Sequence, residues 1–315
     1  MSEPVVSVVI PVHNSADTLV EQLDAVARAQ RSAPPSEILI IDNRSTDNSR
    51  QLAHAWRRRN SDGISGSDIR IICADERASE PYARNVGLAF ARGRYVAYCD
   101  ADDRVTDSWL RVLCELLDEG VYATGPVDMT AMNPAWIANV RGSQVTGKSM
   151  LLNKVPYAHG CNMGFDRDTL IELGGFDERY TAGCDLDIAI RMWESGHELQ
   201  YSQDAGIAYR LRPSLLATYK QGLFYGRYRI PILARLTTLG CTAANGTFTR
   251  LLWLIRRAPE AAFQRATRAR WVWVSAQLVG ERLGTADDQI IDLRNRSSGD
   301  LYNPDVSQFG FEAPQ

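Results

Sequence analysis

Short apolar runs alternate along the N-terminal part of the chain with longer segments in which apolar residues recur every three or four positions. The runs are rich in β-branched residues, which predicts strands that are covered on both faces. They lie at Val5–Val12, Glu37–Ile41, Ile69–Cys73, Arg94–Cys99 and Val121–Gly125. Helical spacing fills the gaps, as at Leu19, Leu23 and Val26. This alternation predicts an α/β fold with a mainly parallel, twisted central sheet flanked by helices.

Residue types at the ends of the helical segments predict where several helices begin and end. A Ser or Asn cap precedes Leu19, Pro81 opens a helix that Gly93 closes, and Thr106 with Asp107 caps another. Further helices are expected at Arg50–Arg59, Ser108–Leu117, Asp168–Glu172 and Ile188–Glu194. Two segments are expected to be irregular, an exposed and mobile loop at Asn60–Ser67 and a longer stretch at Pro126–Pro156.

Polar residues follow three of the predicted strands at the point where each strand ends. They are Pro11–Asn14, Asp42 and Asp100–Asp103. Because parallel strands have their carboxyl ends at one edge of a sheet, these positions should line a single crevice, where open α/β sheets bind ligands.

The segment Asp100–Asp103 carries three carboxylates within four positions. Carboxylates this close repel one another, and a divalent cation among them explains the cluster most simply. Carboxylate oxygens suit Mg²⁺ or Mn²⁺. An acidic turn that caps the following helix is the alternative, but Thr106 and Asp107 are expected to provide that cap, which leaves Asp100 and Asp102 unexplained.

Six ordered motifs resemble those of the family 2 glycosyltransferases, whose nucleotide-sugar-binding fold is called GT-A. They are Ser7–Asn14, Ile41–Asp47, Ala83–Gly87, Asp100–Asp103, Gly174–Glu178 and Asp185–Asp187. Each motif is weak alone, but the ordered set is specific and covers about residues 5–200. The resemblance implies a GT-A domain and an inverting transfer of a sugar from a nucleoside diphosphate, by default UDP, to a hydroxyl of a glycan, lipid-linked or small-molecule acceptor.

The resemblance also implies which residues hold the donor. They are Pro11, Val12, His13, Asn14, Asp42, Arg84, Asp100, Ala101 and Asp102. The first turn and Asp42 would hold the base and ribose, and Arg84 would reach the base or phosphates. Asp100 would approach the ribose or sugar. Asp102 would ligate the metal, Mn²⁺ or Mg²⁺. For His13, which lies in a turn, contacts to the backbone are an equally good explanation.

Asp185 matches the position of the family's catalytic base. The family usually has Glu-Asp here, and this chain has Cys184-Asp185. His159, Asn162 and Asp187 lie on or beside the segments expected to meet the acceptor or sugar, where polar side chains often bind. Asp185 and Asp187 both lie near the N-terminus of a predicted helix, and a helix cap accounts for one of them but not for both.

Composition narrows the classes of partner. The chain has 315 residues and a formal net charge of −3, which gives no basis for nucleic-acid binding. Its six cysteines form no Cys-x-x-Cys pair, as expected for reduced thiols in the cytoplasm. The sequence shows neither a signal-peptide pattern nor an apolar run of about 20 residues, the length that a membrane span needs.

The motifs predict a catalytic GT-A domain at residues 1–205, a helical extension at 206–296 and a loose tail at 297–315. The sheet pattern is expected to stop at Tyr201, after which Arg210 or Arg212 either meets phosphate charge or packs within the extension. The segment Arg250–Arg282 mixes arginines with Trp253, Phe263, Trp271 and Trp273. Such helices lie on the inner face of an anionic membrane or dock on their own domain; the absence of a lipid-anchor motif slightly favours docking.

Two other functions remain open. A sugar-1-phosphate nucleotidyltransferase would share this layout, but it needs a Gly-rich basic loop after the first strand, where this chain has Pro11–Asn14. A non-catalytic nucleotide-sugar-binding or scaffold protein is the other alternative, because of Cys184.

Overall fold

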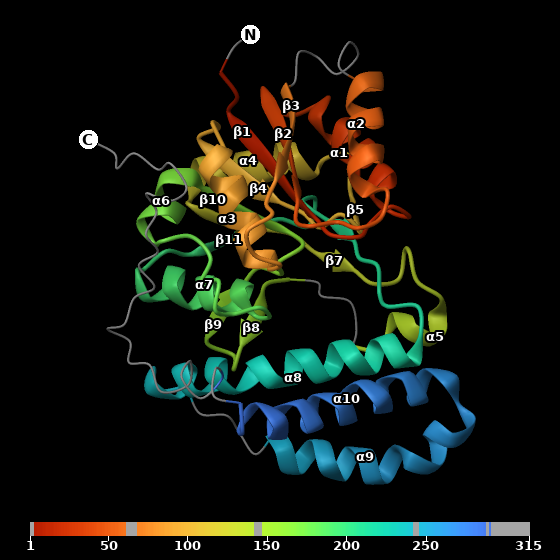
Figure 1. The fold of residues 1–315 in the computed structure, drawn as a ribbon. Helices are drawn as coiled ribbons and strands as arrows, with labels where there is room; N and C mark the ends of the chain where they lie inside the picture. Colours follow the sequence, from red (N-terminus) through yellow and green to blue (C-terminus); the bar gives the residue numbers. More distant parts are fainter. Residues whose placement is uncertain (1–2, 61–67, 142–146, 242–245, 288–289, 291–315) are drawn as a thin grey trace.

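A seven-stranded sheet forms the centre of the N-terminal region (Figure 1). The structure is a computed structural model that describes residues 3–60, 68–141, 147–241, 246–287 and 290. The strand order is β11-β6-β10-β4-β1-β2-β3. The bounds are β1 Val6–Val12, β2 Ser36–Asp42, β3 Asp68–Cys73, β4 Tyr95–Tyr98, β6 Tyr122–Thr124, β10 Met163–Asp166 and β11 Leu199–Tyr201. Strands β3, β2, β1 and β4 are parallel, and β10 runs antiparallel to both β4 and β6. The predicted mainly parallel sheet is confirmed.

Helices cover both faces of this sheet, and the alternation of side chains along β1 shows why. Val6, Val8 and Ile10 belong to one buried cluster, with α1, α2 and α4, whereas Val9 belongs to the other, with α3, α6 and α7. Successive side chains on a strand point to opposite faces, so a continuous β-branched run is buried on both. The helices are α1 Leu19–Gln30, α2 Ser49–Asn60, α3 Glu80–Phe90, α4 Trp109–Glu119, α6 Arg167–Glu172 and α7 Cys184–Glu194.

Three predicted helix ends are wrong in detail. Thr18 stands at the N-terminus of α1 and Ser108 at that of α4, and neither side chain caps its helix. Helix α3 ends at Phe90, before Gly93. Gly93 is required for a different reason, because a Cβ there would lie 2.7 Å from the backbone nitrogen of Ser7 in the turn that leads into β4.

Small elements occupy the segments expected to be irregular or helical. The pieces are β5 Arg104–Val105, β7 Val127–Asp128, α5 Ala135–Ala138, β8 Ser149–Leu151, β9 Val155–Tyr157 and β12 Ile207–Ala208. Strand β12 pairs with both β5 and β7, so the sheet pattern continues beyond Tyr201. The loop at 61–67 and the tail at 297–315 lie outside the described residues.

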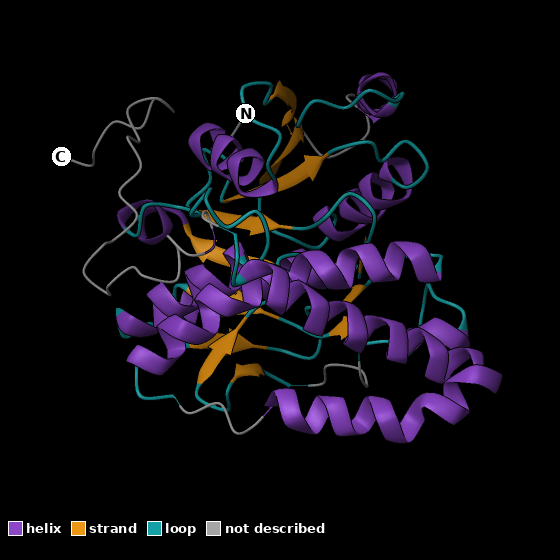
Figure 2. Ribbon diagram, turned by 60° about the horizontal axis from the view of Figure 1, so that its bottom comes forward, coloured by secondary structure: helices purple, strands orange, loops and turns teal. Residues whose placement is uncertain are grey.

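Three long helices form a layer below the sheet (Figures 1 and 2). They are α8 Leu215–Thr238, α9 Gly246–Phe263 and α10 Arg265–Gly284. Small residues bring α8 and α10 together, since Gly222 and Gly226 of α8 contact Ala276 and the region of Gly280. Helix α10 also contacts α9 and α5. None of the described helices is long and apolar enough to cross a bilayer.

The close contact between α8 and α10 predicts that Gly280→Ala destabilises the helical layer. A Cβ at this position would lie 2.2 Å from the carbonyl oxygen of Leu223, so the helix backbones must separate. We expect a lower melting temperature and a loss of about 1–3 kcal/mol in the free energy of unfolding, the usual cost of overpacking. Gly246→Ala is the matched control, because its Cβ would meet no atom of the described residues within 4 Å. Equal melting temperatures for the two variants would contradict the packing described.

Candidate functional site

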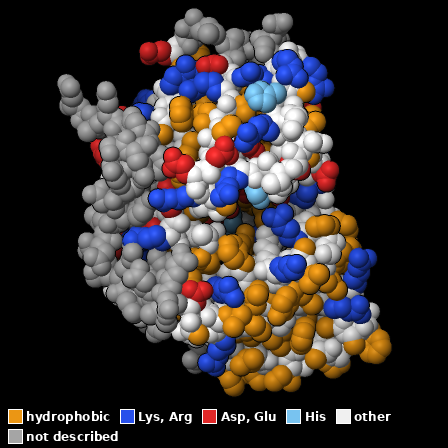
Figure 3. Space-filling view, in the orientation of Figure 1, with side chains coloured by type: hydrophobic (Ala, Val, Ile, Leu, Met, Phe, Trp, Pro, Cys, Tyr) orange, Lys and Arg blue, Asp and Glu red, His pale blue; other side chains and the backbone are white. Residues whose placement is uncertain are grey.

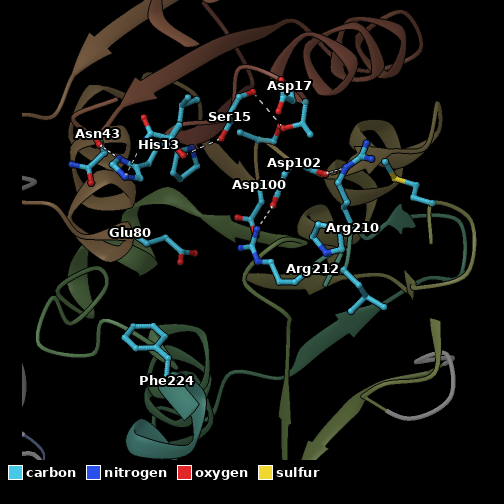
Figure 4. A pocket seen from close by; sticks show the side chains of 18 of the residues that line it. His13, Ser15, Asp17, Asn43, Glu80, Asp100, Asp102, Arg210, Arg212 and Phe224 are labelled. Carbon is cyan, nitrogen blue, oxygen red and sulfur yellow. Dashed lines mark hydrogen bonds and ion pairs between the residues drawn. The ribbon is translucent and has the colours of Figure 1, made fainter. Parts of the chain in front are cut away.

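A cleft of about 850 Å³ opens at the carboxyl ends of β1 and β4 (Figure 4). The turn after β1, the segment after β4, the start of α3 and α8 all contribute to its walls. Of the residues predicted from the sequence, the cleft brings together Pro11, Val12, His13, Asn14, Asp100, Ala101 and Asp102. Distant segments of the chain therefore meet here, as expected for the carboxyl edge of a parallel sheet.

The turn after β1 is held by the segment that follows β2. The Nδ1 atom of His13 lies 2.8 Å from the backbone oxygen of Asn43, and the Asn14 side-chain oxygen accepts from the backbone N–H of Thr46 at 2.8 Å. Asn14 has a φ of 50°, in the left-handed region that Asn tolerates. The backbone contact foreseen for His13 therefore exists, and it leaves the ring at the cleft wall (Figure 4).

Asn43, rather than Asp42, faces the cleft. Asp42 is buried and accepts a hydrogen bond from Nε of Arg50 at 2.6 Å, and it does not line the cleft. The Asn43 amide donates to the carbonyl oxygens of Ala74 and Arg77, and its oxygen accepts from Ser79. These bonds fix the loops on either side of the cleft floor.

The three carboxylates after β4 differ in their surroundings. Asp100 keeps 28% of its side chain exposed at the cleft. Burial of the remainder raises its pKa to about 7, and the negative charge of Glu80 adds to this effect. The positive charge of Arg84 acts in the opposite direction. Asp102 accepts from Nη1 of Arg212 at 3.2 Å, and burial also raises its pKa. Asp103 is buried; its Oδ1 accepts from the backbone N–H of Arg210, and its Oδ2 has no hydrogen-bond partner among the described residues.

Arg84 lies behind the cleft, with 1% of its side chain exposed. Its guanidinium pairs with Glu80 and Asp100, donates to the carbonyl oxygen of Gly160 at 3.0 Å, and donates to Sγ of Cys184 at 3.1 Å. The resemblance implied contact with the base or phosphates. Arg84 is enclosed by protein, and these four groups are its partners.

Asp185 stands in the first turn of α7 and is fixed by backbone hydrogen bonds. Its Oδ2 accepts from the N–H of Gly160 and its Oδ1 from the N–H of Leu186, each at 3.0 Å. Burial raises the pKa of this carboxyl, and the positive charge of Arg84 partly offsets that effect. Asp185 is not among the residues that line this cleft.

Two of the expected acceptor or sugar contacts have structural partners instead. The fully buried Asn162 accepts from the indole of Trp109 and donates to the carbonyl oxygen of Ala205. Asp187 is buried between Arg191 and Arg235. Neither side chain is therefore available to a sugar in this structure.

His159 also lies away from the cleft wall. Its Nε2 is 2.9 Å from the Ser149 hydroxyl, and its ring contacts Tyr157 edge-on. Burial, aided by the charge of Arg141, lowers its pKa to about 4, so this imidazole is neutral at pH 7.

Glu80 lines the cleft and was missed from the sequence. It stands directly before Pro81 at the start of α3, where an acidic residue reads as an ordinary helix-terminus charge. Phe224 of α8 lines the cleft too; it lies in the segment Tyr219–Arg227, which resembles a segment that follows the catalytic domain in many members of the family. Arg210 and Arg212, for which phosphate contact or packing were both open, line the cleft as well (Figure 4).

The acidic group after β4 suits a hard divalent cation. The ligand atoms of Asp100, Asp103 and Cys161 lie within 4.8 Å of one another. Burial raises the pKa of the Cys161 thiol well above its usual value, so the thiolate that a metal requires is disfavoured there. Carboxylates with raised pKa values and an unpartnered buried oxygen fit a cation held by oxygen. Asp102, the predicted ligand, lies outside that close group but on the cleft wall.

Comparisons with known proteins identify the family to which this sequence is similar. Residues 7–174 match the family model described as Glycosyl transferase family 2. Glycosyltransferase AglE of Haloferax volcanii is 27% identical over 214 residues, which cover 67% of this chain and 68% of that protein. Succinoglycan biosynthesis protein ExoO of Rhizobium meliloti is 34% identical over 115 residues, covering 36% and 30%. The chain thus spans about a third of the length of some relatives that it matches.

Solved structures share the fold at low sequence identity. A mannosyltransferase, PcManGT from Pyrobaculum calidifontis, in complex with GDP-Man and Mn²⁺, superposes with a TM-score of 0.60 at 17% identity, covering 90% of this chain and 88% of that one. S. aureus TarS 1-349 in complex with UDP-GlcNAc gives 0.54 at 14% identity, covering 90% and 92%. These likenesses show the fold alone.

The raised pKa of Asp100 predicts that Mn²⁺ binding strengthens with pH. Ionisation near pH 7 creates the carboxylate that a cation needs, so we expect about tenfold tighter binding at about pH 8 than at about pH 6. Without metal, a higher pH lowers the stability of the fold. In the folded state Asp100 keeps its proton up to about pH 7, whereas in the unfolded chain it loses the proton near the ordinary pKa of an aspartate. The free energy of unfolding therefore falls as the pH rises from that ordinary pKa to about 7.

Calorimetric titration with Mn²⁺ at several pH values, paired with melting temperatures with and without the ion, measures both effects. Asp100→Asn should weaken Mn²⁺ binding and reduce the pH dependence of the Mn²⁺-induced shift. A shift of equal size at pH 6 and pH 8 in the parent protein would contradict the assignment.

Proposed function

The chain belongs to glycosyl transferase family 2, and we propose that it moves a sugar from a nucleoside diphosphate donor to an acceptor hydroxyl by a metal-dependent, inverting reaction. The observation that carries the proposal is the cleft itself, in which Asp100 and Asp102 lie opposite the turn His13–Asn14, with Arg210 and Arg212 beside them (Figure 4). This pattern offers one wall for a nucleoside and charged groups for a diphosphate.

The donor fits the cleft by chemistry as well as size. A volume of about 850 Å³ lies within the usual range for sites of drug-sized ligands. His13 and Asn14 supply polar atoms for the base and ribose, whereas Arg212 lies next to Asp102, where it can pair with phosphate oxygens. The donors named for the two solved structures, GDP-Man and UDP-GlcNAc, are of this class. We take UDP as the default nucleotide.

Asp102 and Asp100 are the residues that would hold Mn²⁺ or Mg²⁺. Such an ion, when bound, acts as a Lewis acid that stabilises negative charge on the departing diphosphate. The neighbouring Arg210 is fixed by its backbone bond to Asp103 and by a 2.9 Å bond from its Nε to the backbone oxygen of Asp102. Its charge therefore stays beside the carboxylates and adds to the same stabilisation.

We propose Asp185 as the base that takes the acceptor proton. Two backbone N–H groups orient its carboxylate, and its raised pKa makes the ionised form a stronger base. Direct attack by the acceptor on the face opposite the diphosphate then gives inversion in one step. Glu80 is the rival base, since it lies on the cleft wall and its side chain is half exposed.

A non-catalytic nucleotide-sugar-binding protein is the second candidate. It is favoured by Cys184, which meets Arg84 where the resemblance predicts a glutamate, and by Asp185, which is not among the residues that line the cleft. Donor binding without transfer would favour it.

Donor binding can be tested by thermal shift with UDP, GDP, dTDP and CDP, each with and without Mn²⁺. A nucleotide at a hundredfold excess over its dissociation constant should stabilise the protein by about 2.7 kcal/mol. We expect one nucleotide to give a Mn²⁺-dependent shift that Asp102→Asn removes. If no nucleotide shifts the melting temperature, the proposed donor site is wrong.

The base can be identified by comparing Asp185→Asn with Glu80→Gln. Loss of a general base should lower kcat by about 10²–10⁴. We expect this loss for Asp185→Asn, with donor binding retained, and a smaller one for Glu80→Gln. In the parent protein, kcat should fall as pH decreases through the raised pKa of Asp185, because protonation removes the base. The reverse ranking of the two variants would make Glu80 the base.

A further inference from the structure

Helix α9 exposes an apolar stripe on the side turned away from its partner helix. Phe248, Leu251, Ile255 and Phe263 are 64%, 46%, 70% and 88% exposed. Their spacing of three, four and eight residues places them on one face of the helix. Leu254 and Ala261, which are buried, lie on the opposite face. We call the four exposed residues the outer stripe.

The outer stripe belongs to a larger apolar surface. Figure 3 shows hydrophobic side chains gathered over the layer of α8, α9 and α10, with Lys and Arg side chains at the borders of the patch. Leu216 of α8 and Leu283 of α10 are also exposed, at 65% and 43%. Contiguous apolar patches of this kind are uncommon on monomers and mark sites of interaction.

Two of the three tryptophans in this region, Trp271 and Trp273, have partners within the helical layer. Trp273 is 7% exposed, and Cζ of Arg141 lies 5.0 Å from the centroid of its ring. The indole of Trp271 donates to the carbonyl oxygen of Leu254. They pack inside the helical layer, as one of the two sequence-based interpretations expected. The outer stripe is a separate set of residues, which contributes little to the packing of the fold.

The charge of this layer is opposite to that of the whole chain. From Leu215 to Asp287 the sequence contains eleven Lys and Arg but three Asp and Glu, although the formal net charge of the chain is −3. Glu281 is enclosed and pairs with Arg229 and Arg250. The exposed Arg256 directly follows Ile255 and borders the outer stripe.

We propose that the outer stripe of α9 docks on a membrane surface that contains anionic lipids. The apolar side chains enter the boundary between headgroups and acyl chains, and the surrounding arginines meet lipid phosphates. A second copy of the chain is a poorer occupant, because two such cationic layers would repel each other on contact. Membrane binding of this kind is independent of the reaction proposed for the cleft.

Vesicle flotation of the full chain tests the proposal. We expect binding to vesicles of phosphatidylcholine with phosphatidylglycerol, weaker binding to phosphatidylcholine alone, and partial release in high salt because salt screens charge. The variant F248S/I255S/F263S should lower the bound fraction by about tenfold or more. Phe90→Ser is the matched control, because Phe90 is 47% exposed on α3, outside the patch. Arg256→Glu should weaken binding to the anionic vesicles selectively.

Melting temperatures and nucleotide binding of the variants establish that each remains folded. Equal flotation of the parent and F248S/I255S/F263S would overturn the proposal, as would absence of binding to anionic vesicles at low salt. Sedimentation analysis covers the other occupant. If the parent is a dimer that fails to float and the triple variant is a monomer, the face joins two copies instead.

Discussion

One buried guanidinium connects the parts of the candidate active site. Arg84 of α3 contacts Glu80, Asp100 after β4, the carbonyl oxygen of Gly160 and Cys184 of α7. Burial of the carboxylates around it is tolerable because a positive charge lies among them, and the charge in turn needs those partners. Asp185 hydrogen-bonds to the same Gly160, so Arg84 fixes both the cleft floor and the proposed base.

Cys184 changes the charge balance around Arg84 rather than removing a partner. Its sulfur accepts a hydrogen bond from Arg84, and burial raises the pKa of the thiol, which keeps it neutral. The same arginine already faces Glu80, Asp100 and Asp185, and the pKa of Asp100 is raised to about 7. Another carboxylate at position 184 would add to this negative charge. A neutral thiol satisfies the donor without that cost.

The sequence predicted what depends on local pattern and missed what depends on exact strand ends and spatial order. Continuous β-branched runs identified β1 and β2, because two-sided burial leaves no alternation. Asp42 was expected at the crevice, and its neighbour Asn43 lines it, because the side that a residue faces at the end of a strand changes with each position. The insertion of antiparallel β10 between β4 and β6 is a long-range arrangement without a local signal. Asn162 and Asp187 were misjudged because a polar residue inside a hydrogen-bond network looks the same in sequence as one that binds a ligand.

The helical layer belongs to the active site as much as to the periphery. Helix α8 packs on α10 through glycines and places Phe224 on the cleft wall. Arg141 contacts the rings of Tyr209, Tyr225 and Trp273. It therefore links the segment next to the cleft with both helices. Interiors this closely packed transmit displacement instead of absorbing it. A surface that holds α9 against a membrane would therefore also fix the orientation of the cleft relative to the lipid, through α10 and α8.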